Sequence, residues 1–256
     1  MKLLLERWRL YVEKQERTPR KYYAFDWDDN IVFMPTKIIL LDKEDVEVGM
    51  STRDFADYRE MIGVEEFEYE GRTIVGFAEN AFKFFRHPEG DPQFLVDAET
   101  ATPGPSWNDF AGAINEGSIF AIITARGHHP ETIKSAVRNY INSEYEGINK
   151  QSVIESLRSY KSTPAFSTEG DDDFIIEEYL KLCRFYPVSF KAAAEANPEQ
   201  AKAEKLSEFI EHVKSLNKGK PFEIGFSDDD PGNIEVIKKL KKDQGLSNLI
   251  IKYTGG

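Results

Sequence analysis

The chain has 256 residues, 40% hydrophobic and 30% charged, which is enough to bury the core of one large domain or of a domain with an insert. Its formal charge of −12 argues against broad, sequence-independent binding to nucleic acid, which depends on Lys and Arg, although a local basic groove remains compatible with it. Cys183 is the single cysteine, so an intrachain disulfide and a thiolate metal cluster are both excluded.

The N-terminal residues begin with a short apolar run. Leu3–Leu5 is shorter than the roughly 7–15 apolar residues of a secretory signal. No run approaches the ~18 apolar residues of a membrane span. We therefore expect residues 1–20 to form an N-terminal amphipathic helix, packed on the domain or docked on a partner. We expect the protein to be cytoplasmic and not attached to a membrane.

The first core strand is predicted at Tyr22–Phe25, a short apolar run that ends at Asp26. Residues 35–105 then interrupt the core as an inserted flap or cap. They contain a predicted hairpin, Lys37–Leu41 with Val46–Val48, and a helix from Ser51 to about residue 62. Prolines and glycines between residues 88 and 105 indicate loops.

Helices and strands then alternate. The spacing of apolar residues predicts, in chain order, a helix at Ser106–Ile114 with Ser106 as its cap, a strand at Ser118–Ile123 and a helix at Pro130–Ile141. Residues 142–195 are predicted to be a second, mainly helical insert. In it, Asp171–Asp173 cap a helix, and Pro187 places the strand Phe185–Phe190 at an edge.

The C-terminal third repeats the alternation. Asn197 and Pro198 open a helix, Phe222–Phe226 is a buried strand, Ile234–Leu240 lies on a helix and Leu249–Ile251 is a last strand. The order of elements predicts an α/β fold, a Rossmann-like parallel sheet flanked by helices with inserted cap or flap segments. The basic run at 238–242 is interpreted as a solvated helix face.

Polar side chains follow three of these strands. Asp26, Asp28 and Asp29 come after the first, Thr124 after the second, and the aspartates at 228–230 after the third. Ligands of such sheets bind beyond the carboxyl ends of the strands. Carboxylates that lie close together raise each other's pKa unless a cation intervenes, and a site made only of oxygens suits Mg²⁺. For either acidic cluster alone, a capped turn is the alternative reading.

These segments resemble motifs of the haloacid dehalogenase superfamily. Phe25–Asn30 resembles the first motif, Ile122–Gly127 resembles the second, and Phe226–Asp230 resembles the fourth in its paired-aspartate form. The resemblance covers the core strands and leaves both inserts unassigned. Members that act on phosphate esters carry the second aspartate, here Asp28, which the dehalogenases lack, so the resemblance implies phosphatase chemistry.

The resemblance also implies roles for single residues. Asp26 is expected to be the nucleophile that forms an aspartyl-phosphate, and Asp28 the general acid and then base. Mg²⁺ is expected on the Asp26 carboxylate, the Asp28 main-chain carbonyl and an aspartate of the last motif, with Asp228 preferred over Asp229.

Thr124 is expected to hydrogen-bond a phosphoryl oxygen. Ala125 and Arg126, which follow at once, are expected to bind substrate. Arg126, His128 and His129 have two alternative roles: they contact the substrate phosphate or leaving group, or they cap the loop between the strand and the next helix. Asn30 departs from the family pattern, which usually has Thr or Val there, so the geometry of the first loop is open.

The third motif of the family is a lysine that offsets charge on the nucleophile and phosphoryl group. Lys202, Lys205, Lys218 and Lys220 are available. Helical geometry favours Lys202, because it lies four residues before Leu206 and shares the inward stripe, while Lys205 is the alternative.

Four functions are compatible with these residues. The leading prediction is an Mg²⁺-dependent phosphatase that cleaves a small phosphorylated metabolite or nucleotide. A polynucleotide end phosphatase suits the paired aspartates but is disfavoured by the charge of −12. The others are phosphotransfer to another acceptor and a catalytically degenerate binding or regulatory module.

Overall fold

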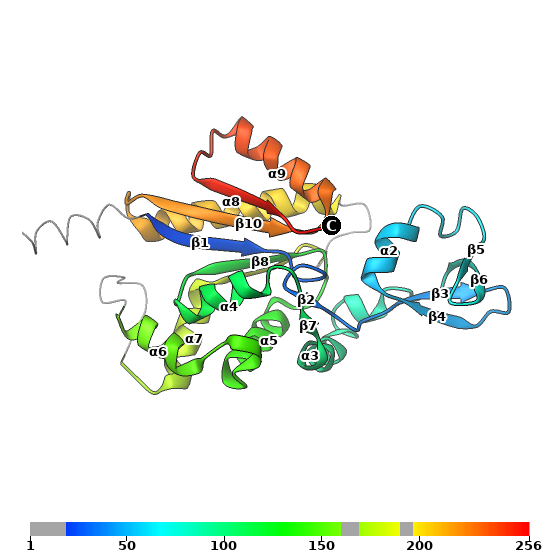
Figure 1. Ribbon diagram of the computed structural model, residues 1–256, viewed down its shortest axis with the longest axis horizontal. Coiled ribbons are helices and arrows are strands. Elements are labelled where there is room, and N and C mark those ends of the chain that lie inside the picture. The colour runs from blue at the N-terminus through cyan, green and yellow to red at the C-terminus, as the bar shows by residue number, and fades with distance from the viewer. Residues whose placement is uncertain (1–18, 160–168, 190–196, 256) are drawn as a thin grey trace, which may run out of the picture.

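The computed structural model describes residues 19–159, 169–189 and 197–255. The N-terminal helix predicted for residues 1–20 therefore lies almost wholly outside the described residues, as does Phe190. Within the described ranges the chain forms a large α/β unit and a small unit made mainly of strands, which lie side by side in Figure 1.

The large unit is built on a five-stranded sheet in which all neighbouring strands run parallel. Its strand order is β11-β10-β1-β8-β9. The strands are β1 (Arg20–Phe25), β8 (Phe120–Thr124), β9 (Arg184–Pro187), β10 (Phe222–Asp228) and β11 (Leu249–Tyr253). Each strand predicted for the core is present, and β9 lies at an edge, as the proline in it indicates.

Helices cover both faces of this sheet. Figure 1 shows α8 and α9 on one face and α4 to α7 on the other. The helices of the large unit are α3 (Asp91–Thr100), α4 (Trp107–Asn115), α5 (Pro130–Asn142), α6 (Lys150–Ser159), α7 (Asp172–Leu182), α8 (Pro198–Asn217) and α9 (Pro231–Asp243), with a short 3₁₀ turn η2 (Tyr145–Gly147). A parallel sheet flanked by helices is the α/β arrangement that the alternation of elements predicts.

Two of the three helix caps predicted for the large unit have the expected hydrogen bond. The Asn197 side chain accepts from Gln200 N at the start of α8, and the Asp171 side chain accepts from Phe174 N at the start of α7. Ser106 occupies the cap position of α4, but its hydroxyl hydrogen-bonds the Ser227 hydroxyl instead. This serine therefore joins α4 to the end of β10.

The small unit contains a four-stranded antiparallel sheet of order β4-β3-β6-β5 and one helix. Its elements are β3 (Ile38–Asp42), β4 (Glu47–Met50), α2 (Thr52–Tyr58), β5 (Phe67–Tyr69), β6 (Arg72–Phe77) and the 3₁₀ turn η1 (Lys83–Phe85). It has its own apolar cluster, separate from that of the large unit. β2 (Val32–Phe33) and β7 (Thr102–Pro103) form a two-stranded antiparallel pair. β2 lies where the chain leaves the main sheet toward the small unit, and β7 lies where it has returned to the large unit.

The structure differs from the sequence reading in three places. Helix α2 ends at Tyr58, before residue 62, because a turn that includes Gly63 at φ 77° follows and places Ile62 in the small cluster. Pro92, read as a loop marker, lies in the first turn of α3, where proline is well tolerated.

The remaining difference concerns the two inserted stretches. Helix α3 packs in the apolar core of the large unit through Phe94, so the separate cluster extends only from Ile38 to Phe85. The described residues of 142–195 also belong to the large unit, because α6 and α7 bury Val153 and Ile175 in its core and β9 extends its sheet. None of the helices in the described ranges is both long and apolar enough to cross a membrane.

Candidate active site

Three carboxylates meet at the carboxyl edge of the main sheet. Asp26 follows β1, Asp228 ends β10, and Asp229 is the next residue. One carboxylate oxygen of each lies within 4.8 Å of the others. Because Phe25 lies beside Ser227 in the parallel register, the two strands bring these distant segments to the same point. We call Asp26, Asp228 and Asp229 the acidic triad.

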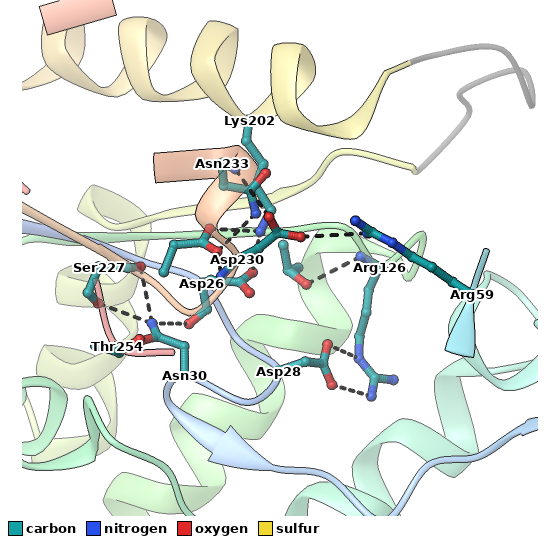
Figure 2. Close-up of polar contacts among 12 residues, drawn as sticks. Asp26, Asp28, Asn30, Arg59, Arg126, Lys202, Ser227, Asp230, Asn233 and Thr254 are labelled. Atoms are coloured by element: carbon teal, nitrogen blue, oxygen red, sulfur yellow. Dashed lines mark hydrogen bonds and ion pairs between the residues drawn. The ribbon is translucent and has the colours of Figure 1, made fainter. Parts of the chain in front are cut away.

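Lys202 is the cation of this site (Figure 2). Its Nζ lies 3.0 Å from Asp26 Oδ1 and 2.9 Å from Asp228 Oδ2, and the residue is 2% exposed. Burial by itself would lower the pKa of the Lys202 ammonium, but attraction to Asp228 and Asp26 outweighs it and the pKa lies above its usual value. Lys205 instead pairs with Glu208 at 2.6 Å among partly exposed side chains. The structure thus brings the lysine favoured by helical spacing to the triad.

One lysine does not balance three carboxylates. Burial raises the pKa of Asp26 well above its usual range, Lys202 opposes this rise, and the negative charges of Asp228 and Asp229 add to it. Burial, followed by the charges of Asp228 and Asp29, raises the pKa of Asp229 to about 7. The site therefore has an excess of negative charge that another cation would stabilise.

The donor set fits a hard divalent cation. Asp26 Oδ1 is buried and has no hydrogen-bond partner among the described residues, although it lies in ion-pair distance of Lys202. Carboxylate oxygens of this kind are the ligands that Mg²⁺ takes in proteins. Within the described ranges, the triad is the one group of three or more acidic, histidine or cysteine side chains close enough to share an ion.

Hydrogen bonds hold the Asp228–Asp230 segment in place. Asp228 Oδ1 accepts hydrogen bonds from Asp230 N at 3.0 Å and from Asn233 Nδ2 at 2.9 Å. Asp230 Oδ1 accepts from Gly232 N at 2.6 Å and so caps α9. The orientation of the Asp228 carboxylate is therefore fixed from two sides before any ligand binds.

Asp28 points its carboxylate away from the triad and toward Arg126 (Figure 2). Arg126 Nε donates to Oδ2 and Nη2 to Oδ1, both at 2.7 Å, which is a bidentate pair. The guanidinium carbon lies 4.5 Å from the Phe85 ring centroid and 5.1 Å from that of Phe94. Because the Arg126 side chain is buried and engaged in this pair, it holds Asp28 in place, and a direct contact with substrate stays a prediction.

A second layer of polar contacts holds Arg126. Its Nη1 lies 3.2 Å from His128 Nε2, and His128 Nδ1 lies 3.1 Å from Asp91 Oδ1. Burial, with a contribution from Arg126, lowers the pKa of His128 to about 4, so the ring is neutral near pH 7. The partners then assign the tautomer: Nδ1–H donates to Asp91, and Nε2 accepts from Arg126.

His129 has a different role from its neighbour. Its Nδ1 accepts a hydrogen bond from Glu131 N at 3.2 Å, which caps helix α5. The capping alternative for this histidine is thus the one that the geometry shows. Asp91 was not identified from the sequence, because it lies in a stretch that resembles loop, and its carboxylate meets His128 only in the folded chain.

The Asn30 side chain holds the loop that follows β1. Its Nδ2 lies 3.1 Å from the carbonyl oxygens of Asp26 and Ser227 and 3.0 Å from Ser227 Oγ. Its Oδ1 accepts from Thr254 Oγ1 at 2.8 Å. Asn30 is fully buried, so one side chain ties the ends of β1 and β10 to the segment after β11.

Thr124 ends β8 at the same edge of the sheet. Its Oγ1 accepts a hydrogen bond from Arg126 N at 3.2 Å, which leaves its own proton free to donate. Ala125 follows and is exposed, so the backbone beside Thr124 is open to a bound molecule. The binding roles expected for these two residues stay predictions.

A pocket of about 780 Å³ opens beside the triad, between the large and the small unit. On the sheet side it is lined by Asp29, Asp229 and Asp230, and on the other by Arg53, Ala56, Asp57 and Arg59 of the α2 segment. The Thr52 side chain hydrogen-bonds Asp29 and so joins α2 to the loop after β1. Helix α2 faces the main sheet in Figure 1.

Comparisons with models of known protein families, with curated proteins and with solved structures gave no significant match.

Proposed function

We propose that the protein hydrolyses phosphomonoesters through an aspartyl-phosphate on Asp26 and requires Mg²⁺. The observation that carries the proposal is the acidic triad with Lys202 buried against it at the carboxyl edge of a parallel sheet. A second aspartate, Asp28, stands two residues from the first and is held outside the triad. In this proposal Asp26 is the nucleophile, Lys202 is the cation and Asp28 is the separate group for proton transfer.

In the first step an Asp26 carboxylate oxygen attacks phosphorus, and the bond from phosphorus to the leaving oxygen breaks. Asp28 gives its proton to that oxygen, so the product leaves as a neutral alcohol. The Arg126 pair fixes the direction of Asp28. Each Asp28 oxygen has a second lone pair, which can carry the proton while the two hydrogen bonds to Arg126 persist.

In the second step Asp28 takes a proton from water, and the hydroxide oxygen attacks the same phosphorus. The bond between phosphorus and Asp26 breaks, which releases phosphate and restores both carboxyl groups. Throughout, the Lys202 ammonium offsets negative charge on Asp26, and the Thr124 hydroxyl donates to a phosphoryl oxygen. Asp26, Asp228 or Asp229 and the Asp28 carbonyl would hold Mg²⁺, which when bound offsets the charge of the phosphoryl oxygens.

The test is turnover of p-nitrophenyl phosphate with Mg²⁺ or with EDTA, by the wild type and by Asp26→Asn. Asp243→Asn, an exposed position at the end of α9, is the matched control. We expect metal-dependent turnover that Asp26→Asn abolishes and Asp243→Asn leaves unchanged, with a covalent phosphate detected on Asp26 by mass spectrometry after acid quench. Turnover that survives Asp26→Asn would rule out this nucleophile. A folded protein that binds Mg²⁺ without turnover on a panel of phosphate esters would favour a binding module.

A further inference from the structure

The pocket beside the triad contains two arginines that the proposed chemistry does not use. Arg53 lies in the first turn of α2, and Arg59 is the C-cap residue that follows its last residue, Tyr58. Both line the pocket opposite Asp229, and both are exposed. The group that is transferred already has Lys202 and Thr124 on the sheet side, so these arginines are available for another part of the substrate.

Helix α2 is oriented so that its charged side faces the pocket. Phe55 and Tyr58 pack against the apolar cluster of the small unit. Arg53, Ala56 and Asp57 recur at intervals of three and four residues, which places them on one helical face, and all three line the pocket. The small Ala56 between the charged residues leaves room for a ligand along this face.

Neither Arg53 nor Arg59 has a close ionic partner in the pocket. Arg53 attracts the carboxyl groups of Asp29 and Asp54, but it forms no hydrogen bond or ion pair of 4.0 Å or less with any residue in the described ranges. Arg59 Nη1 lies 3.8 Å from Asp230 Oδ2, which is beyond hydrogen-bond distance, and its side chain is 52% exposed. An exposed pair of this length contributes little, so Arg59 remains free to bind another anion.

The carboxylates that share the pocket are mostly committed elsewhere. Asp230 caps α9 with its other oxygen, and Asp29 accepts the hydrogen bond from Thr52. Asp229 belongs to the triad. Asp57 is the acidic residue of the α2 segment that lines the pocket beside Arg53 and Arg59, so this wall carries a net positive charge that faces the acidic sheet side.

We propose that Arg53 and Arg59 bind a second phosphate of the substrate, so that the preferred substrate is a phosphomonoester that carries another phosphate group. The planar guanidinium fork matches phosphate oxygens better than it matches neutral groups. The inference rests on the proposed function, because it assigns the reacting phosphate to the triad. Two sources have this chemistry, a small bisphosphorylated molecule and the phosphorylated end of an oligonucleotide.

The experiment compares adenosine 5′-monophosphate, adenosine 3′,5′-bisphosphate and a 5′-phosphorylated tetranucleotide in the wild type, Arg53→Gln and Arg59→Gln. We expect kcat/KM of the wild type to be highest for a compound with a second phosphate. Each substitution should lower this value by about 10-fold while changing p-nitrophenyl phosphate turnover less than twofold, as one charged hydrogen bond to phosphate implies. A higher kcat/KM for the bisphosphate than for the tetranucleotide identifies a small bisphosphorylated molecule as the substrate class. A higher kcat/KM for the tetranucleotide identifies the phosphorylated end of an oligonucleotide.

Two further variants serve as controls. Arg158→Gln, on α6 and remote from the pocket, should change none of these values. Asp57→Asn removes the opposing negative charge and should strengthen binding of the bisphosphate to the catalytically blocked Asp26→Asn protein, measured by calorimetry. The inference would be overturned if neither the bisphosphate nor the tetranucleotide had a higher kcat/KM than the monophosphate, or if neither arginine substitution had an effect, while p-nitrophenyl phosphate turnover still upheld the proposed function. If the wild type did not turn over p-nitrophenyl phosphate, this result would instead refute the proposed phosphatase function.

Discussion

Replacing Asp229 with asparagine tests the electrostatics of the metal site without measuring activity. In the metal-free protein, burial and the charges of Asp228 and Asp29 raise the pKa of Asp229 from 3.8 to about 7. Because the folded protein keeps this proton more tightly than the unfolded chain does, stability falls as the pH rises from about 4 to about 7. Above about pH 7 the full penalty of the ionised carboxylate remains.

The size of the penalty follows from the pKa. At 1.36 kcal/mol per pKa unit, the rise corresponds to about 4 kcal/mol. Asp229 is only partly buried, and solvent screening reduces this to about 2 kcal/mol. We therefore expect Asp229→Asn to be about 2 kcal/mol more stable than the wild type at pH 8 in EDTA, with a difference that shrinks as the pH falls to 5.

The assay is urea unfolding at pH 5 and pH 8, with EDTA and with Mg²⁺. Mg²⁺ should stabilise the wild type by about 3 kcal/mol at 100 times its dissociation constant and the variant by less than about 1 kcal/mol, which reverses the order of stability seen in EDTA. Asp243→Asn is the control and should behave as the wild type does. Equal stability of wild type and Asp229→Asn at pH 8 in EDTA, or a difference that does not change with pH, would refute the reasoning.

Two further substitutions test the groups around the triad. Lys202→Met should abolish Mg²⁺-dependent turnover and destabilise the protein by about 3–5 kcal/mol in urea unfolding, because it leaves buried carboxylates without their cation; wild-type turnover would exclude Lys202 from the reaction. His128→Phe keeps the ring against Phe94 but removes the acceptor for Arg126. It should lower kcat about tenfold, as the loss of about 1–3 kcal/mol from one charged hydrogen bond implies, with KM changed little; a change in KM alone would contradict a positioning role.

Much of the core site could be predicted from local sequence. Short apolar runs that end in Asp26 and Asp228 indicate parallel strands, and parallel strands place their carboxyl ends at one edge. Helical spacing favours Lys202, because a residue four positions before Leu206 shares the buried face of the helix. In each case a spacing of a few residues decides the direction of the side chain.

The contacts made over long sequence separations could not be predicted in this way. Asp28 and Arg126 are 98 residues apart, and no local pattern indicates that a buried guanidinium would meet that carboxylate. Pro92 shows a different limit, since proline is typical of loops and is also favoured in the first turn of a helix. The insert predicted at residues 35–105 is longer than the small unit, because α3 buries Phe94 in the core of the large unit.

Arg126 also connects the site to the small unit. Besides Asp28, its guanidinium donates from Nη2 to Thr36 Oγ1 at 3.1 Å and stacks on Phe85. Thr36 precedes β3 and Phe85 ends η1, so both chain segments that link the two units contact the residue that holds Asp28. The position of the small unit and the direction of Asp28 therefore depend on the same buried guanidinium. Residues 36–85 thus contribute to the site in two ways, through the pocket wall of α2 and through the contacts of Thr36 and Phe85 with Arg126.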